Sequence, residues 1–116
     1  MRVLITGSRQ RIDYHFIKEK MIEHIQDEKE VVIIHGGAKG VDSIANKIAI
    51  ELGYKTEVYL PKYNSFGVRA PLIRNEQMIN SKPDIVLAFP NSSEEGGGTW
   101  HTIRLAQKKR IRTFIY

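Results

Sequence analysis

Residues 31–45 have the sequence VVIIHGGAKGVDSIA, and this stretch decides the fold. Its four aliphatic residues, 31–34, are typical of a strand that is buried on both faces of a parallel sheet. The glycines that follow end this strand, and apolar residues at helical spacing begin at Val41. A strand, a glycine turn and a helix in this order predict one unit of an α/β sheet.

The same alternation extends along the whole chain. Strands are predicted at 3–5, 31–34, 56–60, 85–89 and 113–116, and helices at 13–28, 41–52, 71–80 and 99–109. This order predicts a parallel sheet with helices on both faces. The longest irregular segments are 61–70 and 89–98, and loops of this length commonly have a function.

Composition limits the class of protein. The chain has 116 residues, which fits one domain, and its 41% hydrophobic residues are typical of a globular protein. Lys and Arg exceed Asp and Glu by 18 to 13, and the net charge of +5 favours anionic partners. The absence of cysteine and of histidines at metal-ligand spacing predicts no metal site. No apolar run approaches the ~18 residues of a membrane span, so we expect a cytoplasmic protein without a membrane partner.

Three turns that follow predicted strands form the candidate binding site. Ligands of open parallel sheets bind beyond the carboxyl ends of the strands. The candidate ligand-binding residues in these turns are Gly7, Ser8, Arg9, Gly36, Gly37, Lys39, Gly40, Gly97, Gly98 and Thr99. Strand-to-helix turns often need glycine for their geometry alone, but three such turns at one edge favour a phosphate site. We expect the backbone N–H groups of Gly36 and Gly37 to approach the phosphate.

Four residues outside these three turns complete the predicted site. Asp42 is either an acid favoured by the start of a helix or the acceptor of a ribose hydroxyl. Arg74 and Asn75 lie early in the third predicted helix, where Arg74 suits a phosphate, although a lone helical Arg more often forms a surface ion pair. Tyr63 lies in a polar loop and is the best candidate to stack on a base.

Two common nucleotide-binding motifs are absent. A P-loop requires Lys and then Ser or Thr after its last glycine, whereas Gly40 is followed by Val41 and Asp42. A dinucleotide fingerprint requires an acidic residue at the end of the next strand, which here ends at Leu60 and Pro61. These differences argue against a nicotinamide-dependent dehydrogenase, and we expect no cofactor.

Several segments together resemble one superfamily. They are MRVLITGSR at 1–9, HGGAKGVDSIA at 35–45, IRNEQM at 73–78, DIVLAFP at 84–90 and GGGT at 96–99. This combination resembles the SLOG superfamily, which contains the DNA-processing Smf proteins and the Lonely-Guy hydrolases, and within it the small YspA/YpsA-like branch. The resemblance implies a Rossmann-like α/β/α sandwich with a five-stranded parallel sheet in the order 3-2-1-4-5. It also implies a single ligand-binding domain over residues 1–116 and self-association as a dimer or tetramer.

The resemblance bears on catalysis as well. Lonely-Guy hydrolases have a catalytic glutamate after their glycine run, and Thr102 occupies the matching position here. We therefore assign no catalytic residue and leave it uncertain whether the protein is an enzyme, with binding favoured. A hydrolase of an N-glycosidic or phosphate bond remains the alternative, with Asp42, Glu94 or Glu95 as the carboxylate.

The main functional hypothesis is capture of a small nucleotide-derived ligand, such as an ADP-ribose-like or cyclic-nucleotide-like signal, by a sensor or sequestering protein. A second alternative is single-stranded nucleic-acid binding, suggested by the charge of +5 and by the Smf resemblance. The positive residues are scattered except for the cluster at 108–112, which we assign to the helix dipole and to solubility. On this ground we do not expect nucleic acid as a partner.

Overall fold

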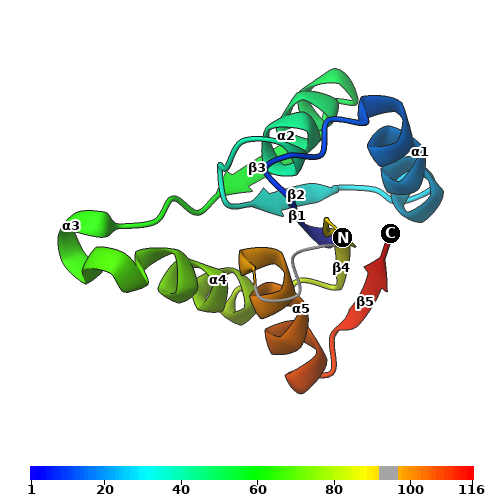
Figure 1. Cartoon of the computed structure of the whole chain (residues 1–116). Helices are drawn as coiled ribbons and strands as arrows, with labels where there is room; N and C mark the ends of the chain where they lie inside the picture. The colour runs from blue at the N-terminus through cyan, green and yellow to red at the C-terminus, as the bar shows by residue number, and fades with distance from the viewer. Residues whose placement is uncertain (92–96) are drawn as a thin grey trace.

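Five parallel strands form one sheet in the computed structural model, which describes residues 1–91 and 97–116 (Figure 1). The strands are β1 (Arg2–Gly7), β2 (Val32–His35), β3 (Lys55–Val58), β4 (Ile85–Phe89) and β5 (Arg112–Ile115). Their order is β3-β2-β1-β4-β5, with Leu4 of β1 beside Ile34 of β2 and Val86 of β4. The predicted parallel sheet and its strand order are confirmed.

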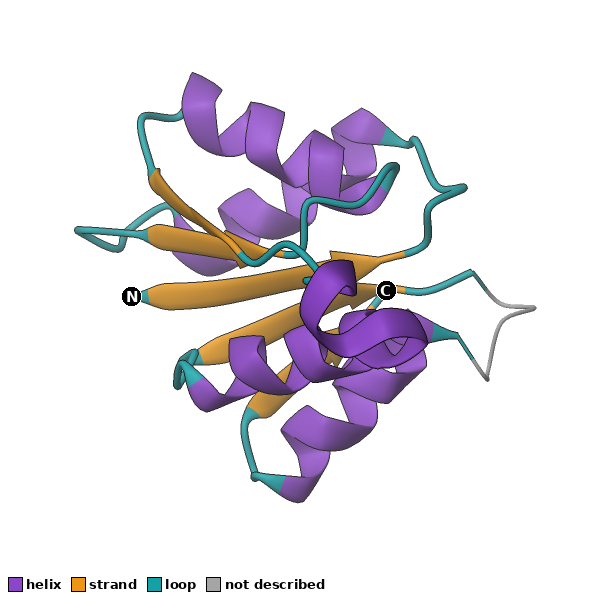
Figure 2. Ribbon diagram, turned by 90° about the vertical axis from the view of Figure 1, so that its left-hand side faces the viewer, coloured by secondary structure: helices purple, strands orange, loops and turns teal. Residues whose placement is uncertain are grey.

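Helices cover both faces of this sheet (Figure 2). Helices α1 (Tyr14–Ile25) and α2 (Val41–Glu51) lie on one face, and α4 (Ala70–Asn80) and α5 (Gly98–Lys108) lie on the other. Segment 61–70, predicted as a loop, instead contains α3 (Tyr63–Phe66) and the 3-10 helix η1 (Gly67–Arg69). These single turns, which protrude at one end of the molecule in Figure 1, have no buried residue, so no apolar periodicity could reveal them.

The core consists of two apolar clusters, one on each face of the sheet. The larger cluster joins the strands to α1 and α2, and the smaller one joins them to α4 and α5. Neighbouring residues of β1 belong to different clusters, since Val3 and Ile5 face one layer and Leu4 faces the other. This two-sided burial explains why the central strands are continuously apolar.

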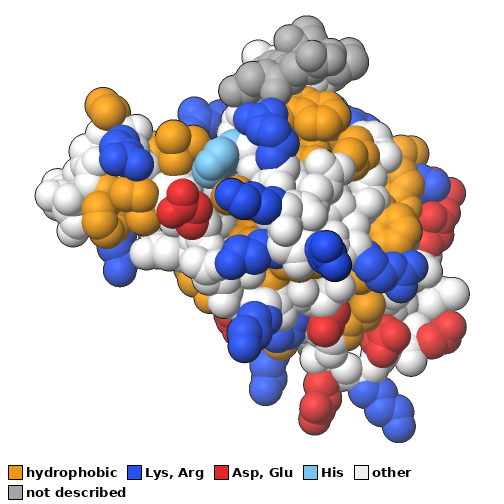
Figure 3. All heavy atoms as spheres, turned by 90° about the horizontal axis from the view of Figure 1, so that it is seen from below, with side chains coloured by type: hydrophobic (Ala, Val, Ile, Leu, Met, Phe, Trp, Pro, Cys, Tyr) orange, Lys and Arg blue, Asp and Glu red, His pale blue; other side chains and the backbone are white. Residues whose placement is uncertain are grey.

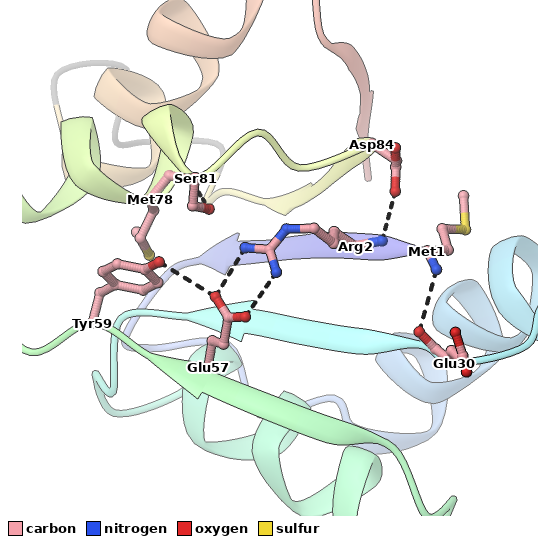
Figure 4. A network of polar contacts seen from close by, with 8 residues as sticks. All are labelled: Met1, Arg2, Glu30, Glu57, Tyr59, Met78, Ser81 and Asp84. Atoms are coloured by element: carbon pink, nitrogen blue, oxygen red, sulfur yellow. Dashed lines mark hydrogen bonds and ion pairs between the residues drawn. The ribbon is translucent and has the colours of Figure 1, made fainter.

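A charged pair lies on the α4–α5 face, where it links β1 to β3 across β2 (Figure 4). The Arg2 guanidinium donates two hydrogen bonds to the Glu57 carboxylate, at 2.7 and 2.9 Å. The Tyr59 hydroxyl donates to the same carboxylate at 3.3 Å. The Arg2 guanidinium lowers the pKa of Glu57. The pair thus ties the edge strand to the centre of the sheet.

We expect the Arg2–Glu57 pair to contribute only modestly to stability. Its side chains are 30% and 39% exposed, so a double-mutant cycle of Arg2→Ala and Glu57→Ala should give a coupling of about 0.5 kcal/mol, reduced by salt. Because the folded pKa of Glu57 is lowered, this contribution is present above its unfolded pKa and is lost as pH falls through the folded pKa. Urea unfolding of the four proteins measures the coupling, and a value independent of both salt and pH would contradict this account.

Candidate functional site

A cavity of about 410 Å³ lies at the carboxyl edge of the sheet, between the turn after β1 and the first turns of α2, α4 and α5. It brings together eight of the predicted site residues, namely Gly7, Ser8, Arg9, Asp42, Arg74, Asn75, Gly98 and Thr99. A smaller adjoining hollow of about 280 Å³ contains Gly36, Gly37 and Lys39 and shares Arg9 and Arg74 with the cavity. Gly40 and Gly97 are the residues that precede α2 and α5.

The turn after β2 is closed by hydrogen bonds to its own side chains. The Gly36 and Ala38 N–H groups both donate to Oδ2 of Asp42, at 3.1 and 3.3 Å. The Gly37 N–H donates to Nδ1 of His35 at 3.0 Å. The expectation that Gly36 and Gly37 offer these N–H groups to a phosphate is therefore wrong, because acceptors within the turn already hold them.

Glycine is required in this turn for close packing. Gly40 has a φ of 76°, and a Cβ at this position would collide with the backbone of Ser8 and Arg9. The Val41 N–H donates to the Ser8 carbonyl oxygen at 3.1 Å, so the start of α2 lies directly against the turn after β1. The glycine therefore allows two turns of the site to touch.

His35 and Asp42 are oriented by α2. Nε2 of His35 lies 2.8 Å from Oδ1 of Asn46, and its Nδ1 accepts the Gly37 N–H. The proton of the neutral ring is therefore on Nε2. Burial raises the pKa of Asp42, although the two N–H donors and the charge of Arg74 act in the opposite direction. Our sequence analysis missed Asn46, whose only signal was its place one helical turn after Asp42.

Arg74 and Asn75 connect the turns on either side of the cavity. Nη1 of Arg74 donates to the carbonyl oxygens of Gly36 and Tyr59, at 2.5 and 3.3 Å, and its Nε donates to Asn75 at 2.9 Å. Nδ2 of Asn75 then donates to the Gly98 carbonyl oxygen at 3.4 Å. Arg74 is 9% exposed and Asn75 is 4% exposed, so both are buried parts of the scaffold. Within the described part of the chain, Nη2 of Arg74 has no hydrogen-bond partner.

The mouth of the cavity offers donors for an anion. Arg9 is exposed there, and neither its guanidinium nor its backbone N–H has a hydrogen-bond partner among residues 1–91 and 97–116. The positive end of α2 lies beside it. Of the charged side chains that the structure places in the cavity wall, Arg9 and Arg74 are positive and Asp42 is negative. The arrangement suits a phosphate group.

Other predicted residues lie elsewhere. Tyr63 is 56% exposed on α3 and lines a separate hollow. Thr102 is fully buried, donates to the Gly98 carbonyl oxygen at 3.2 Å and does not line the cavity. Glu94 and Glu95 lie outside the described residues.

The described residues lack two kinds of feature. No group of His, Asp or Glu side chains there could hold a metal ion. No helix in the same residues has the length and apolar character needed to cross a membrane.

We expect Asp42 to be mainly structural. Asp42→Ala leaves two N–H groups without an acceptor and should lower the free energy of unfolding by about 1–3 kcal/mol, whereas Asp42→Asn keeps an acceptor oxygen and should lose less. Because the folded pKa of Asp42 is raised, its contribution is complete below the unfolded pKa and declines as pH rises through the folded pKa. Urea unfolding across this pH range should therefore show that the free energy of unfolding falls with pH in the wild type but not in Asp42→Asn. A difference between the two free energies that does not change with pH would refute the raised pKa.

The collision at Gly40 can be separated from backbone strain. Gly40 and Gly53 have nearly equal positive φ values, 76° and 75°, but a Cβ at Gly53 meets no atom within 4 Å. Gly53→Ala should cost about 1–2 kcal/mol through strain alone, and Gly40→Ala should cost clearly more. Thermal and urea unfolding measure both variants, and equal losses would show that the two turns can move apart.

Comparison with known proteins places this chain in a family. The model of the YspA, cpYpsA-related SLOG family matches residues 1–66. The Gene 61 protein of Mycobacterium phage D29 is 34% identical over 116 residues, covering 95% of this chain and 91% of the phage protein.

A solved structure has the same fold. This is DNA processing protein A from Helicobacter pylori, described for its mode of binding single-stranded DNA, with a TM-score of 0.71 and 23% identity. The match covers 99% of this chain, which spans only 64% of that chain. Our exclusion of nucleic acid as a partner is wrong, because it rested on scattered charge and a protein with this fold binds single-stranded DNA. From the match over residues 1–66 and the similarity to the phage protein, we conclude that the chain belongs to the YspA, cpYpsA-related SLOG family.

Proposed function

We propose that this protein binds single-stranded DNA and that the cavity at the carboxyl edge of the sheet holds backbone phosphate. The observation that carries the proposal is the position of Arg9, an exposed guanidinium at the mouth of a cavity beside the start of α2, with no hydrogen-bond or ion-pair partner among the described residues. A guanidinium and a helix N-terminus both favour phosphate oxygens. The single-stranded DNA binding described for DNA processing protein A, which shares the fold, supports this choice of ligand.

The charge around the cavity supports the same ligand. Lys39 is exposed on the turn after β2 and shares the smaller hollow with Arg9, and Arg69 is exposed at the start of α4. Figure 3 shows Lys and Arg side chains spread over the face that carries α4 and α5, with acidic side chains among and around them. The chain has 18 Lys and Arg against 13 Asp and Glu, so its association with a polyanion should weaken steeply with salt.

Binding is favoured over hydrolysis by the carboxylates available. Asp42 is the only carboxylate among the described residues that line the cavity, and one of its oxygens already accepts two N–H groups. A general base must reach its proton directly or through one water. A carboxylate held inside a turn by hydrogen bonds suits a structural role better than the role of a general base.

A small nucleotide remains a second candidate ligand because of the size of the cavity. A volume of about 410 Å³ falls within the range of pockets that enclose small molecules. Oδ1 of Asp42 has no hydrogen-bond partner in the described part of the chain and could accept a ribose hydroxyl. A free nucleotide and a DNA phosphate would then compete for the same donors.

Arg9→Ala tests the proposal. We expect it to weaken binding of a fluorescent oligodeoxythymidine by about tenfold or more and to lower the slope of log K against log salt by about 0.7 for the lost phosphate contact. Lys29→Ala is the matched control, because Lys29 is an exposed cation in the turn between α1 and β2, at the opposite edge of the sheet. Fluorescence anisotropy measures both variants, and equal affinities for them would refute the role of Arg9.

Competition separates the two candidate ligands. Displacement of the oligonucleotide by ADP-ribose at concentrations well below those at which inorganic phosphate displaces it would favour the small nucleotide. A wild-type protein that binds no single-stranded DNA even at low salt would overturn the proposed function.

A further inference from the structure

Residues 60–72 form an arm that carries more than half of the large hydrophobic side chains exposed among the described residues. Among the described residues, nine large hydrophobic side chains are exposed, and five of these belong to the arm: Leu60, Tyr63, Phe66, Val68 and Leu72. The arm protrudes from the body of the protein, with α3 at its tip (Figure 1). Exposed apolar side chains that gather on one segment are typical of a binding surface, whereas singly scattered ones need no explanation.

The two aromatic rings of the arm lie together on α3. Tyr63 and Phe66 are three residues apart on a single helical turn, so their side chains leave the helix on the same side. They are 56% and 40% exposed, and no ring–ring contact joins them to any described aromatic residue. Both rings therefore present a substantial part of their surface to solvent.

Charge distinguishes among possible occupants. Lys62 and Arg69 flank α3 and are exposed, and Figure 3 shows hydrophobic side chains beside Lys and Arg side chains on the protruding arm. The cores of protein interfaces are depleted of lysine, whereas single-stranded nucleic acid combines flat apolar bases with anionic phosphates. Two exposed rings flanked by cations match the chemistry of single-stranded nucleic acid.

The arm is also continuous with the cavity. Val68 and Leu72 belong to the arm and line the same cavity as Arg9 and Arg74. Tyr63 lies near enough for its hydroxyl to affect the pKa of Arg74. A strand whose phosphate is held at Arg9 would therefore have its neighbouring nucleotides beside the arm.

We propose that the arm is a base-stacking platform, on which Tyr63 and Phe66 stack the bases of the strand whose phosphates occupy the cavity. This inference rests on the proposed function and adds the part of the ligand that the phosphate site does not recognise. Stacking on an aromatic ring is tolerant of base identity, so the arm would increase affinity without selecting a sequence.

The test compares normal and abasic oligonucleotides. Tyr63→Ala and Phe66→Ala should each weaken binding of oligodeoxythymidine by about tenfold, whereas Tyr63→Phe keeps the ring and should stay within about twofold of the wild type. An abasic oligonucleotide of equal length and charge should bind all of these proteins equally, because it has no base to stack. Ile50→Ala removes a side chain that is 68% exposed on α2 and controls for loss of apolar surface.

The outcomes separate this inference from the proposed function. If Tyr63→Ala and Phe66→Ala lose equal affinity for normal and abasic probes, or lose none for either, the stacking platform is overturned. In that case, a loss of affinity of Arg9→Ala for both probes would still support the phosphate site. Sedimentation under the binding conditions tests another occupant, a second copy of the chain. A dimer that Phe66→Ala converts to monomers would also overturn stacking. Both aromatic side chains are exposed, so thermal unfolding should show that the variants remain folded.

Discussion

The hydrogen bond from Arg74 to the carbonyl oxygen of Gly36 joins the two halves of this molecule. Gly36 lies in the turn between β2 and α2, and Arg74 comes from α4 on the opposite face of the sheet. Through Asn75 the same pair reaches Gly98 at the start of α5. The turns that surround the cavity are therefore held by one short buried chain of donors and acceptors, and their spacing depends on it.

Placing Arg74 inside the protein has a cost that the structure offsets. Burial lowers the pKa of this guanidinium, and the charge of the Asp42 carboxylate raises it. Asp42 is itself buried, and its Oδ2 is satisfied by two backbone N–H groups. Buried polar networks stabilise a unique arrangement only when their members find partners, which explains why the turn uses His35 and Asp42 as acceptors.

In this arrangement, buried residues shape the cavity and exposed residues at its mouth are available to contact a ligand. The side chains that brace the turns, His35, Asp42, Arg74 and Asn75, are buried and each makes hydrogen bonds, so they shape the cavity and leave recognition to groups at its mouth. Arg9 supplies charge there, and the arm supplies apolar surface next to it. The two features match the two chemical parts of a nucleic-acid strand, and neither requires a particular base sequence.

Local patterns in the sequence determined most of the fold. The apolar strand 85–89 and the periodic helix from Val41 depend on residues close in the chain, and both were predicted within one or two positions. The sheet edge at which the glycine turns meet followed from the alternation of strands and helices. The arm was missed because α3 and η1 bury no side chain and therefore leave no apolar pattern.

Only the tertiary structure decided what the site residues do. Sequence placed Arg74, Asp42 and Gly36 near one edge, but not which donor meets which acceptor. Arg74 and Gly36 are 38 residues apart, so their hydrogen bond exists only once α4 has packed on the sheet. Asp42 meets the N–H groups of Gly36 and Ala38 within one strand-to-helix turn, and Arg9 is left exposed at the mouth of the cavity. Hydrogen-bond partners are set by three-dimensional proximity, which residue types and spacing along the chain do not encode.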